Sequence, residues 1–210
     1  LLDLRVFRST NFTLAMIIMS ILALSMFGTL TLLPQYLQNV VGLESFSAGL
    51  ILLPGSIMMG LLGPLMGRIY DARGTRPLLI PGTILVSAAL FFYSTVGEQT
   101  QWWVLVIVQA VMSVGLAMSF TPLFSASLGS LQRSLYSHGS AVLNTMQQVA
   151  GAAGVAVLLV TYSAILHAGE DEGLSTALAG APGARMAFLI AAIISLAAVA
   201  LSPFVRKPAD

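Results

Sequence analysis

The sequence predicts an all-α integral membrane protein with six transmembrane helices. Its 210 residues are 57% hydrophobic and 8% charged, with a mean hydropathy of +0.93, whereas a soluble domain carries about 25% charged residues. Crossing about 30 Å of hydrocarbon at 1.5 Å per residue takes roughly 20 residues of helix, and six apolar stretches meet that length. The charges lie between these stretches, so the bilayer is the expected solvent.

The six expected helices form one membrane domain over residues 1–210. Their boundaries follow from the apolar stretches, and they span residues 12–33, 47–66, 78–96, 102–128, 140–166 and 184–205. We expect Pro34 to end the first helix and Pro122 to interrupt the fourth, since proline lacks a backbone N–H. In two three-helix units of inverted topology these prolines correspond, and paired breaks of this kind point to a substrate path.

The charges between the apolar stretches alternate in sign along the chain. They are Arg5 and Arg8 before the first helix, Glu44 after it, an arginine cluster after the second, Glu98 after the third, Arg133 after the fourth, the acidic run 170–172 after the fifth, and Arg206 and Lys207 after the sixth. Arg185, at the expected start of the sixth helix, breaks this order. Loops rich in Lys and Arg stay in the cytoplasm, so we expect both termini there and Trp102 and Trp103 at the outer interface.

The arginine cluster has the sequence GRIYDARGTRP and spans Gly67–Pro77. A chain this apolar holds such a cluster only in water, so the cluster marks a membrane boundary. We expect a loop whose defining residues are Gly67, Arg68, Asp71, Arg73, Gly74 and Arg76. From the residues alone, its acidic residue Asp71 is expected to pair locally with Arg68 or Arg73, a surface ion pair worth about 0–1 kcal/mol.

Polar residues inside the expected spans are amides and hydroxyls, with no Asp, Glu, Lys or Arg at mid-membrane. An unpaired amide in hydrocarbon costs roughly 2–7 kcal/mol, so each amide must face protein or a wet cavity. Asn144 and Gln148 share one helical face with Gly151. The third and sixth helices carry only Ser, Thr and Tyr93 as polar residues, so we expect them to face lipid.

The candidate cavity-lining residues are Phe27, Gln35, Gln38, Gln109, Ser113, Phe120, Asn144 and Gln147. A plainer interpretation applies to Gln109, Asn144 and Gln147, because interhelical amide bonds are common in membrane bundles. It also applies to Phe27 and Phe120, because aromatic residues at helical spacing are often core. Methionines such as Met112, Met118 and Met146 would suit a wall of broad apolar selectivity. Cysteine is absent and the two histidines lie far apart, so the sequence indicates no disulfide and no metal site. We expect no cofactor and no enzymatic activity. The sequence also shows no basic stripe for nucleic acid.

Three stretches carry a family resemblance. GRIYDARGTRP resembles the cytoplasmic loop signature of the major facilitator superfamily, with the residues of the arginine cluster in the places of that signature. Leu33–Gly55 and His138–Val157 resemble the carboxy-terminal half of the fourteen-span drug:proton antiporters, and residues 1–12 are similar to the entry of their seventh core helix. The resemblance implies one half of a major facilitator fold, built from 3+3 inverted repeats.

The resemblance also implies a function. It indicates half of a secondary active transporter that exports amphipathic or cationic drugs and small molecules in exchange for protons. The first and fourth helices would line the cavity, and the second and fifth would lie beside the other half. The implied partners are the lipid bilayer of a bacterial inner membrane, a small-molecule substrate, and an amino-terminal half or a second copy of the chain.

Two alternatives stay open at this point. One is a carrier of the same fold for another small solute, which would favour charged pocket residues. The other is a membrane half-protein that transports nothing and binds or regulates a partner chain. The acidic residues that couple those antiporters to protons belong to their amino-terminal half, so we expect this chain alone not to run proton-driven export.

Overall fold

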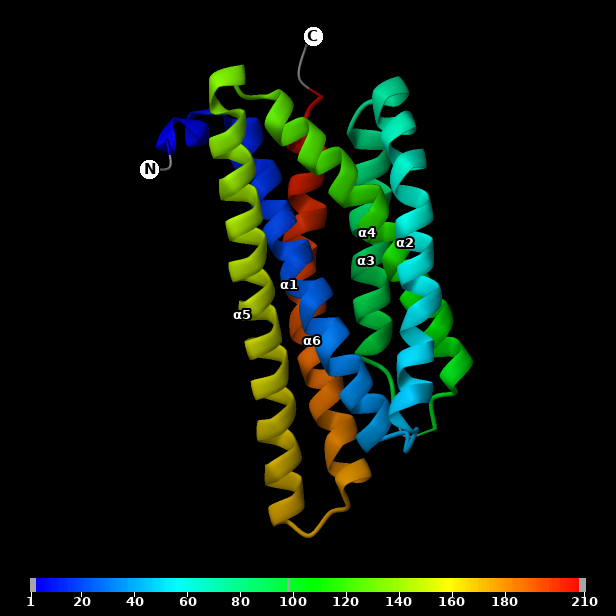
Figure 1. The fold of residues 1–210 in the computed structure, drawn as a ribbon. Coiled ribbons are helices and arrows are strands. Elements are labelled where there is room, and N and C mark those ends of the chain that lie inside the picture. The colour runs from blue at the N-terminus through cyan, green and yellow to red at the C-terminus, as the bar shows by residue number, and fades with distance from the viewer. Residues whose placement is uncertain (1–2, 98, 208–210) are drawn as a thin grey trace.

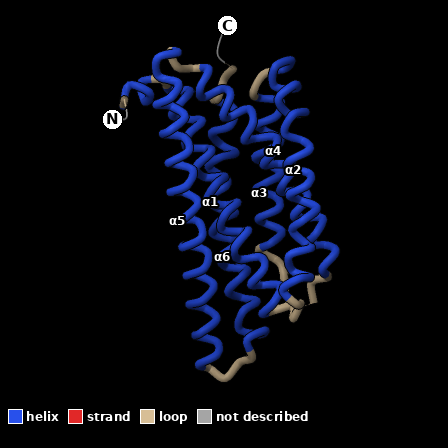
Figure 2. Tube along the Cα trace, viewed as in Figure 1, coloured by secondary structure: helices blue, strands red, loops and turns tan. Residues whose placement is uncertain are grey.

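The computed structural model describes residues 3–97 and 99–207, and six long helices dominate it (Figures 1 and 2). The helices are α1 (Thr10–Asn39), α2 (Ser45–Arg73), α3 (Arg76–Tyr93), α4 (Trp102–Gly129), α5 (Tyr136–Asp171) and α6 (Thr176–Leu201). Short 3-10 turns η1 (Leu4–Arg8), η2 (Arg133–Leu135) and η3 (Ser202–Phe204) flank them. All six helices are long and apolar enough to cross a membrane, which confirms the predicted class. Glu98 lies outside the described residues.

Several helices extend beyond their expected ends. Pro34 does not end α1, which continues to Asn39, because a proline removes a single intrahelical bond and neighbouring groups in a membrane bundle compensate. Ser175 caps α6 by accepting from Leu178 N at 3.4 Å. This cap starts the helix eight residues before the expected position 184, so Arg185 lies within it.

The helices pack in two groups of three. One group consists of α1 with α5 and α6, and the other of α4 with α2 and α3. Each group therefore combines one helix from one half of the chain with two helices from the other half. Figure 1 shows α5, α1 and α6 side by side, with α3, α4 and α2 beside them. α3 and α6 join the two groups through Ser87 and Ser195, whose hydroxyl oxygens lie 2.7 Å apart.

α3 and α6, the expected lipid-facing pair, each have one face inside the bundle and one outside. Ser195 is 1% exposed, because the serines of the two helices satisfy each other inside the bundle. Only their outer faces are open, through side chains such as Phe92 and Ile193. The least covered helices are α2 and α5, with 17% and 22% of their most apolar 18-residue windows buried, against 50% for α1, α3 and α4.

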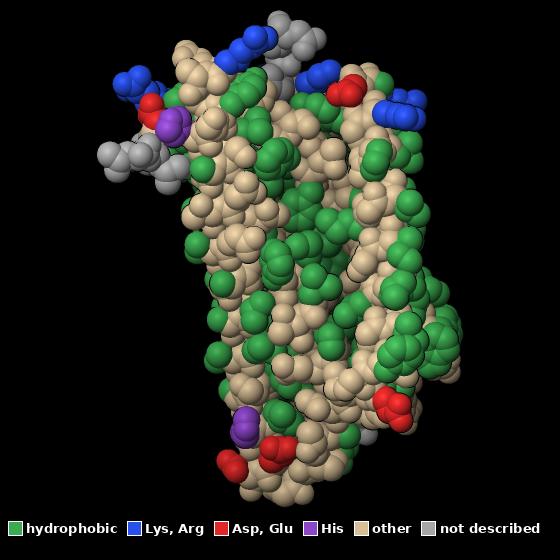
Figure 3. Space-filling view, viewed as in Figure 1, with side chains coloured by type: hydrophobic (Ala, Val, Ile, Leu, Met, Phe, Trp, Pro, Cys, Tyr) green, Lys and Arg blue, Asp and Glu red, His purple; other side chains and the backbone are tan. Residues whose placement is uncertain are grey.

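Charge is sorted along the bundle axis. Lys and Arg side chains gather at the end that holds both termini, and acidic side chains gather mainly at the opposite end (Figure 3). Arg185 is the basic residue at the acidic end, where its Nε donates to the Val96 carbonyl. The Tyr36 hydroxyl donates to the next carbonyl, Gly97, at 2.7 Å. Arg185, which breaks the charge alternation of the sequence, therefore binds the connection between α3 and α4 through a backbone carbonyl.

Candidate functional site

A cavity of about 450 Å³ lies between α1, α2, α4 and α5. Its lining residues are Met19, Met26, Met59, Phe120, Thr121, Phe124, Ser125 and Gln147. The molecular face between α5 and α2 is hollowed, and hydrophobic side chains line the hollow (Figure 3). The site is open to one side and carries no charged residue in its wall.

Helical spacing gathers these side chains. Met19 and Met26 are seven residues apart on α1, which is two turns, so they share a face. Phe120 and Phe124 are one turn apart on α4, as are Thr121 and Ser125. The resulting wall joins flexible thioethers to two aromatic rings, which favours flat apolar ligands of varied shape.

Gln147 is the amide in this wall. No backbone or side-chain group of the described residues forms a hydrogen bond with its amide. An unpaired amide in hydrocarbon is costly, so Gln147 has donors and an acceptor to offer a ligand or water in the cavity. Phe120 is the other expected site residue that the structure brings here.

The expected site residues on α1 lie elsewhere. Phe27 packs its ring against Gly151 of α5, in the α1–α5 contact. Gln38 donates to the Pro34 carbonyl at 3.2 Å and accepts from Ser45 Oγ at 2.8 Å, so it secures the α1–α2 connection. Gln35 is half-buried near the same end of α1.

The expected polar residues on α4 lie on its far side. Gln109 is buried and accepts a hydrogen bond from the Tyr93 hydroxyl at 3.0 Å. Ser113 is buried against Gly55 of α2. Both residues therefore sit in the α2–α3–α4 packing, apart from the cavity.

Asn144 occupies a different surface. It is exposed on α5, as is Gln148 one turn later, and neither amide has a hydrogen-bond partner in the described part of the chain. α5 thus exposes bare amides and, at other positions around the helix, apolar residues such as Val149 and Val160.

Sequence reasoning missed the methionines that line the cavity and named others. Met112 is buried in the core, Met118 is packed against it and Met146 is exposed on α5. The 3.6-residue period offered a signal for Met19 and Met26, but neighbouring faces of an apolar helix carry similar side chains. Only the packing of α1 against α4 and α5 shows which face is the wall.

The arginine cluster is partly helical. Gly67, Arg68 and Asp71 lie in the last turns of α2, which runs through Arg73, so the expected loop is confined to a tight turn. Gly74 makes that turn with a φ of 81°, a backbone conformation that glycine adopts without steric cost.

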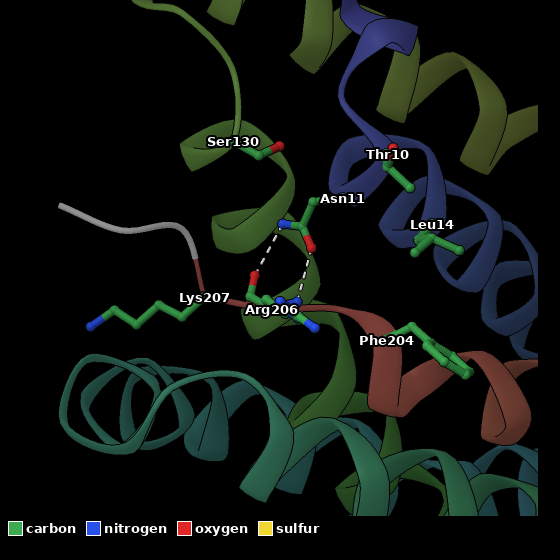
Figure 4. Close-up of a pocket in the computed structure, with 7 residues that line it drawn as sticks. All are labelled: Thr10, Asn11, Leu14, Ser130, Phe204, Arg206 and Lys207. Carbon is green, nitrogen blue, oxygen red and sulfur yellow. Dashed lines mark hydrogen bonds between the residues drawn. The ribbon is translucent and has the colours of Figure 1, made fainter.

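The partners of the cluster come from the carboxy-terminal segment. Arg76 Nε donates to the Pro203 carbonyl at 3.0 Å, and Lys207 Nζ donates to the Asp71 carbonyl at 3.0 Å. Arg206 is fixed by Asn11 through bonds of 2.9 and 3.0 Å (Figure 4). The Asp71 carboxylate is exposed and has no ion pair or hydrogen bond to any described residue, so the local pairing with Arg68 or Arg73 is not formed.

Comparison with known proteins gives consistent matches. Residues 1–155 match the family described as Major Facilitator Superfamily. The chain is 38% identical over 216 residues to lincomycin resistance protein LmrB of Listeria monocytogenes, which covers 99% of the chain and 45% of that protein. It is 35% identical over 176 residues to LmrB of Bacillus subtilis, covering 84% of the chain and 36% of the relative.

A mycobacterial relative shows the same pattern. The multidrug resistance protein B homolog of Mycobacterium tuberculosis is 30% identical over 166 residues, which cover 77% of the chain and 31% of that protein. The chain thus spans less than half the length of each of these relatives.

Proposed function

Because the chain belongs to the major facilitator superfamily, whose members are membrane transporters and not enzymes, we propose that it acts as one half of a secondary active transporter. We assign it to the carboxy-terminal half, on the resemblance of Leu33–Gly55 and His138–Val157. The relatives related to lincomycin and multidrug resistance support export of drugs and small molecules as the activity of the complete transporter.

The cavity between α1, α2, α4 and α5 is its substrate wall. The observation that carries this assignment is the unpaired Gln147 amide beside Phe120 and three methionines. Aromatic faces attract cations, thioethers adapt to varied shapes, and one amide orients a polar group. Such a wall fits amphipathic or cationic molecules better than a polar metabolite, for which a charged lining would be expected.

The outer faces of α2 and α5 are the contact with the other half. They are the least covered helices of the bundle, and the bare amides of Asn144 and Gln148 gain partners there. The Asp71 carboxylate lacks a partner in the described chain, and the start of α5 at Tyr136 has no side-chain cap. Because a carboxylate at a helix amino terminus is stabilising, each half would supply what the other lacks, and a second copy could do so by two-fold symmetry.

The termini and the arginine cluster lie on the cytoplasmic side in this proposal. Basic residues gather at that end of the bundle, and such loops remain in the cytoplasm. The relatives are bacterial, which supports the inner (plasma) membrane of a bacterium as the location of the chain. No Asp or Glu occupies the middle of a described span, so the groups that bind the coupling proton come from outside this chain.

A chimera tests the proposal. In it, this chain replaces the segment of Listeria monocytogenes LmrB to which it aligns. We expect the chimera to confer resistance to lincomycin or to expel ethidium from sensitive bacteria, whereas the chain expressed alone does neither. A chimera present in the membrane at normal amount that supports neither activity would refute the proposal.

A further inference from the structure

A second hollow, of about 420 Å³, lies at the end of the bundle that holds both termini. It is formed by the turn between α2 and α3 and by the carboxy-terminal segment. Its charged lining residues are Arg73, Arg76, Arg206 and Lys207. Asp71 does not line it, so the hollow is a concentrated cationic site separate from the transport cavity.

Backbone donors at the start of α3 add to this charge. The N–H groups of Thr75 and Arg76 have no acceptor among the described residues, whereas Leu78 and Leu79 both donate to the Thr75 carbonyl. Pro77 has no N–H. The amino terminus of an 18-residue helix also carries the positive end of its dipole, which favours an anion at this place.

Thr75 supplies an independent observation. It is 2% exposed, and its hydroxyl is buried without a hydrogen-bond partner. It occupies the cap position of α3 but does not cap the helix. A buried hydroxyl left without a partner is destabilising, so the wall of the hollow holds a donor that a bound acceptor would satisfy.

The cations are held in position, and their charged groups remain available. Arg76 and Lys207 each use one donor on a backbone carbonyl, at Pro203 and Asp71. Asn11 clamps Arg206 through its backbone (Figure 4), which leaves its guanidinium without a bond to the described chain. The guanidinium of Arg73 is likewise unbonded and exposed.

We propose that this hollow binds a phosphate group, carried by the headgroup of an anionic phospholipid or by a soluble phosphate. Planar guanidinium groups match the geometry of phosphate oxygens, and a helix start adds backbone donors to the same oxygens. The ligand bridges α2, α3 and the carboxy-terminal segment, so its binding ties the arginine cluster to the end of the chain.

Binding to the purified 210-residue chain in neutral detergent and phosphate-free buffer tests this. The probes are phosphatidylglycerol and phosphatidylcholine, followed by native mass spectrometry, and inorganic phosphate, followed by calorimetry. Preference for phosphatidylglycerol over both other probes assigns the site to a lipid headgroup. Binding of inorganic phosphate as tight as that of the lipid assigns it to a soluble anion, and binding of neither overturns the proposal.

Matched charge removals locate the site. Arg73→Gln with Arg206→Gln should weaken binding about tenfold, since each basic contact with a phosphate contributes measurably. Arg8→Gln with Arg133→Gln removes the same charge from exposed positions at the same end and should change affinity less than about twofold. Equal losses in the two double variants would overturn the proposal, because they indicate general attraction.

Thr75 gives a further test with little change in shape. Thr75→Val keeps the volume of the buried side chain and removes the hydroxyl, and Thr75→Ser keeps the hydroxyl. We expect about fivefold weaker binding in the valine variant, as for one lost hydrogen bond, and near-normal binding in the serine variant. Unchanged binding in the valine variant would contradict the assignment to this hollow.

Discussion

Tyr93 of α3 donates a hydrogen bond to Gln109 Oε1 of α4 at 3.0 Å, and both side chains are buried. The ring of Tyr93 also stacks on Phe188 of α6, with centroids 4.9 Å apart. One tyrosine therefore connects three helices, and the Gln109 amide serves the packing of the bundle.

The first prediction concerns this pair. Gln109→Leu and Tyr93→Phe should each lower the free energy of unfolding by roughly 1 kcal/mol, and the double variant should cost less than the sum because each single change leaves a buried partner unpaired. Thermal unfolding in detergent, followed by circular dichroism, gives the values. Fully additive losses would show that the bond contributes nothing.

The second prediction concerns the α1–α5 contact. A Cβ at Gly154 would meet the backbone of Leu24, whereas a Cβ at Gly60 meets nothing within 4 Å. Gly154→Ala should therefore force the helices apart and cost roughly 1–3 kcal/mol. Gly60→Ala should be neutral or stabilising by up to about 1 kcal/mol, as alanine is the better helix former. Similar melting temperatures of the two variants would disprove this account of the contact.

The third prediction concerns orientation. The chain has no cysteine, so single cysteines at the exposed positions Arg133 and Glu170 can be labelled without background. In intact cells an impermeant maleimide should react with the cysteine at position 170. It should react with the cysteine at position 133 only after the membrane is permeabilised, because the basic end is cytoplasmic. Labelling of both positions from the same side would exclude the six-span topology.

The fourth prediction concerns the substrate wall. Gln147→Leu in the chimera with LmrB should lower export about fivefold, the effect of one lost hydrogen bond. Thr161→Val is the control on the same helix, because it removes a hydroxyl that bonds only the Val157 carbonyl of α5 itself and does not line the cavity. Export rates are compared at equal protein level. Equal losses of export rate in both variants would show that the Gln147 amide in the cavity has no specific role in transport.

The sequence is sufficient to predict the class and the number of helices, because charge scarcity and span length are properties of composition. Helix ends are less predictable: Pro34 suggests a stop, but a membrane helix continues through a proline whose lost bond is local. Arg185 is the exception to the charge alternation. It donates a hydrogen bond to the Val96 carbonyl in the connection between α3 and α4, and no local sequence pattern reveals this long-range contact.

The site is only partly predictable for the same reason. Phe120 is recognisable as an aromatic residue within a span and Gln147 as a polar one, and the structure places both in one cavity. Gln109 has the same local appearance as Gln147, yet it faces Tyr93. Ser195 resembles a lipid-facing serine until Ser87 is placed against it. In each case the deciding fact is which neighbouring helix lies beside the residue.

The central claim is that this chain is half of a transporter and needs the other half to work. Its most direct test uses vesicles with an imposed pH gradient, into which either the 210-residue chain or the chimera with LmrB is reconstituted. Movement of ethidium is followed by fluorescence. The account predicts gradient-dependent movement with the chimera and none with the chain alone; gradient-dependent movement with the 210-residue chain by itself would contradict it.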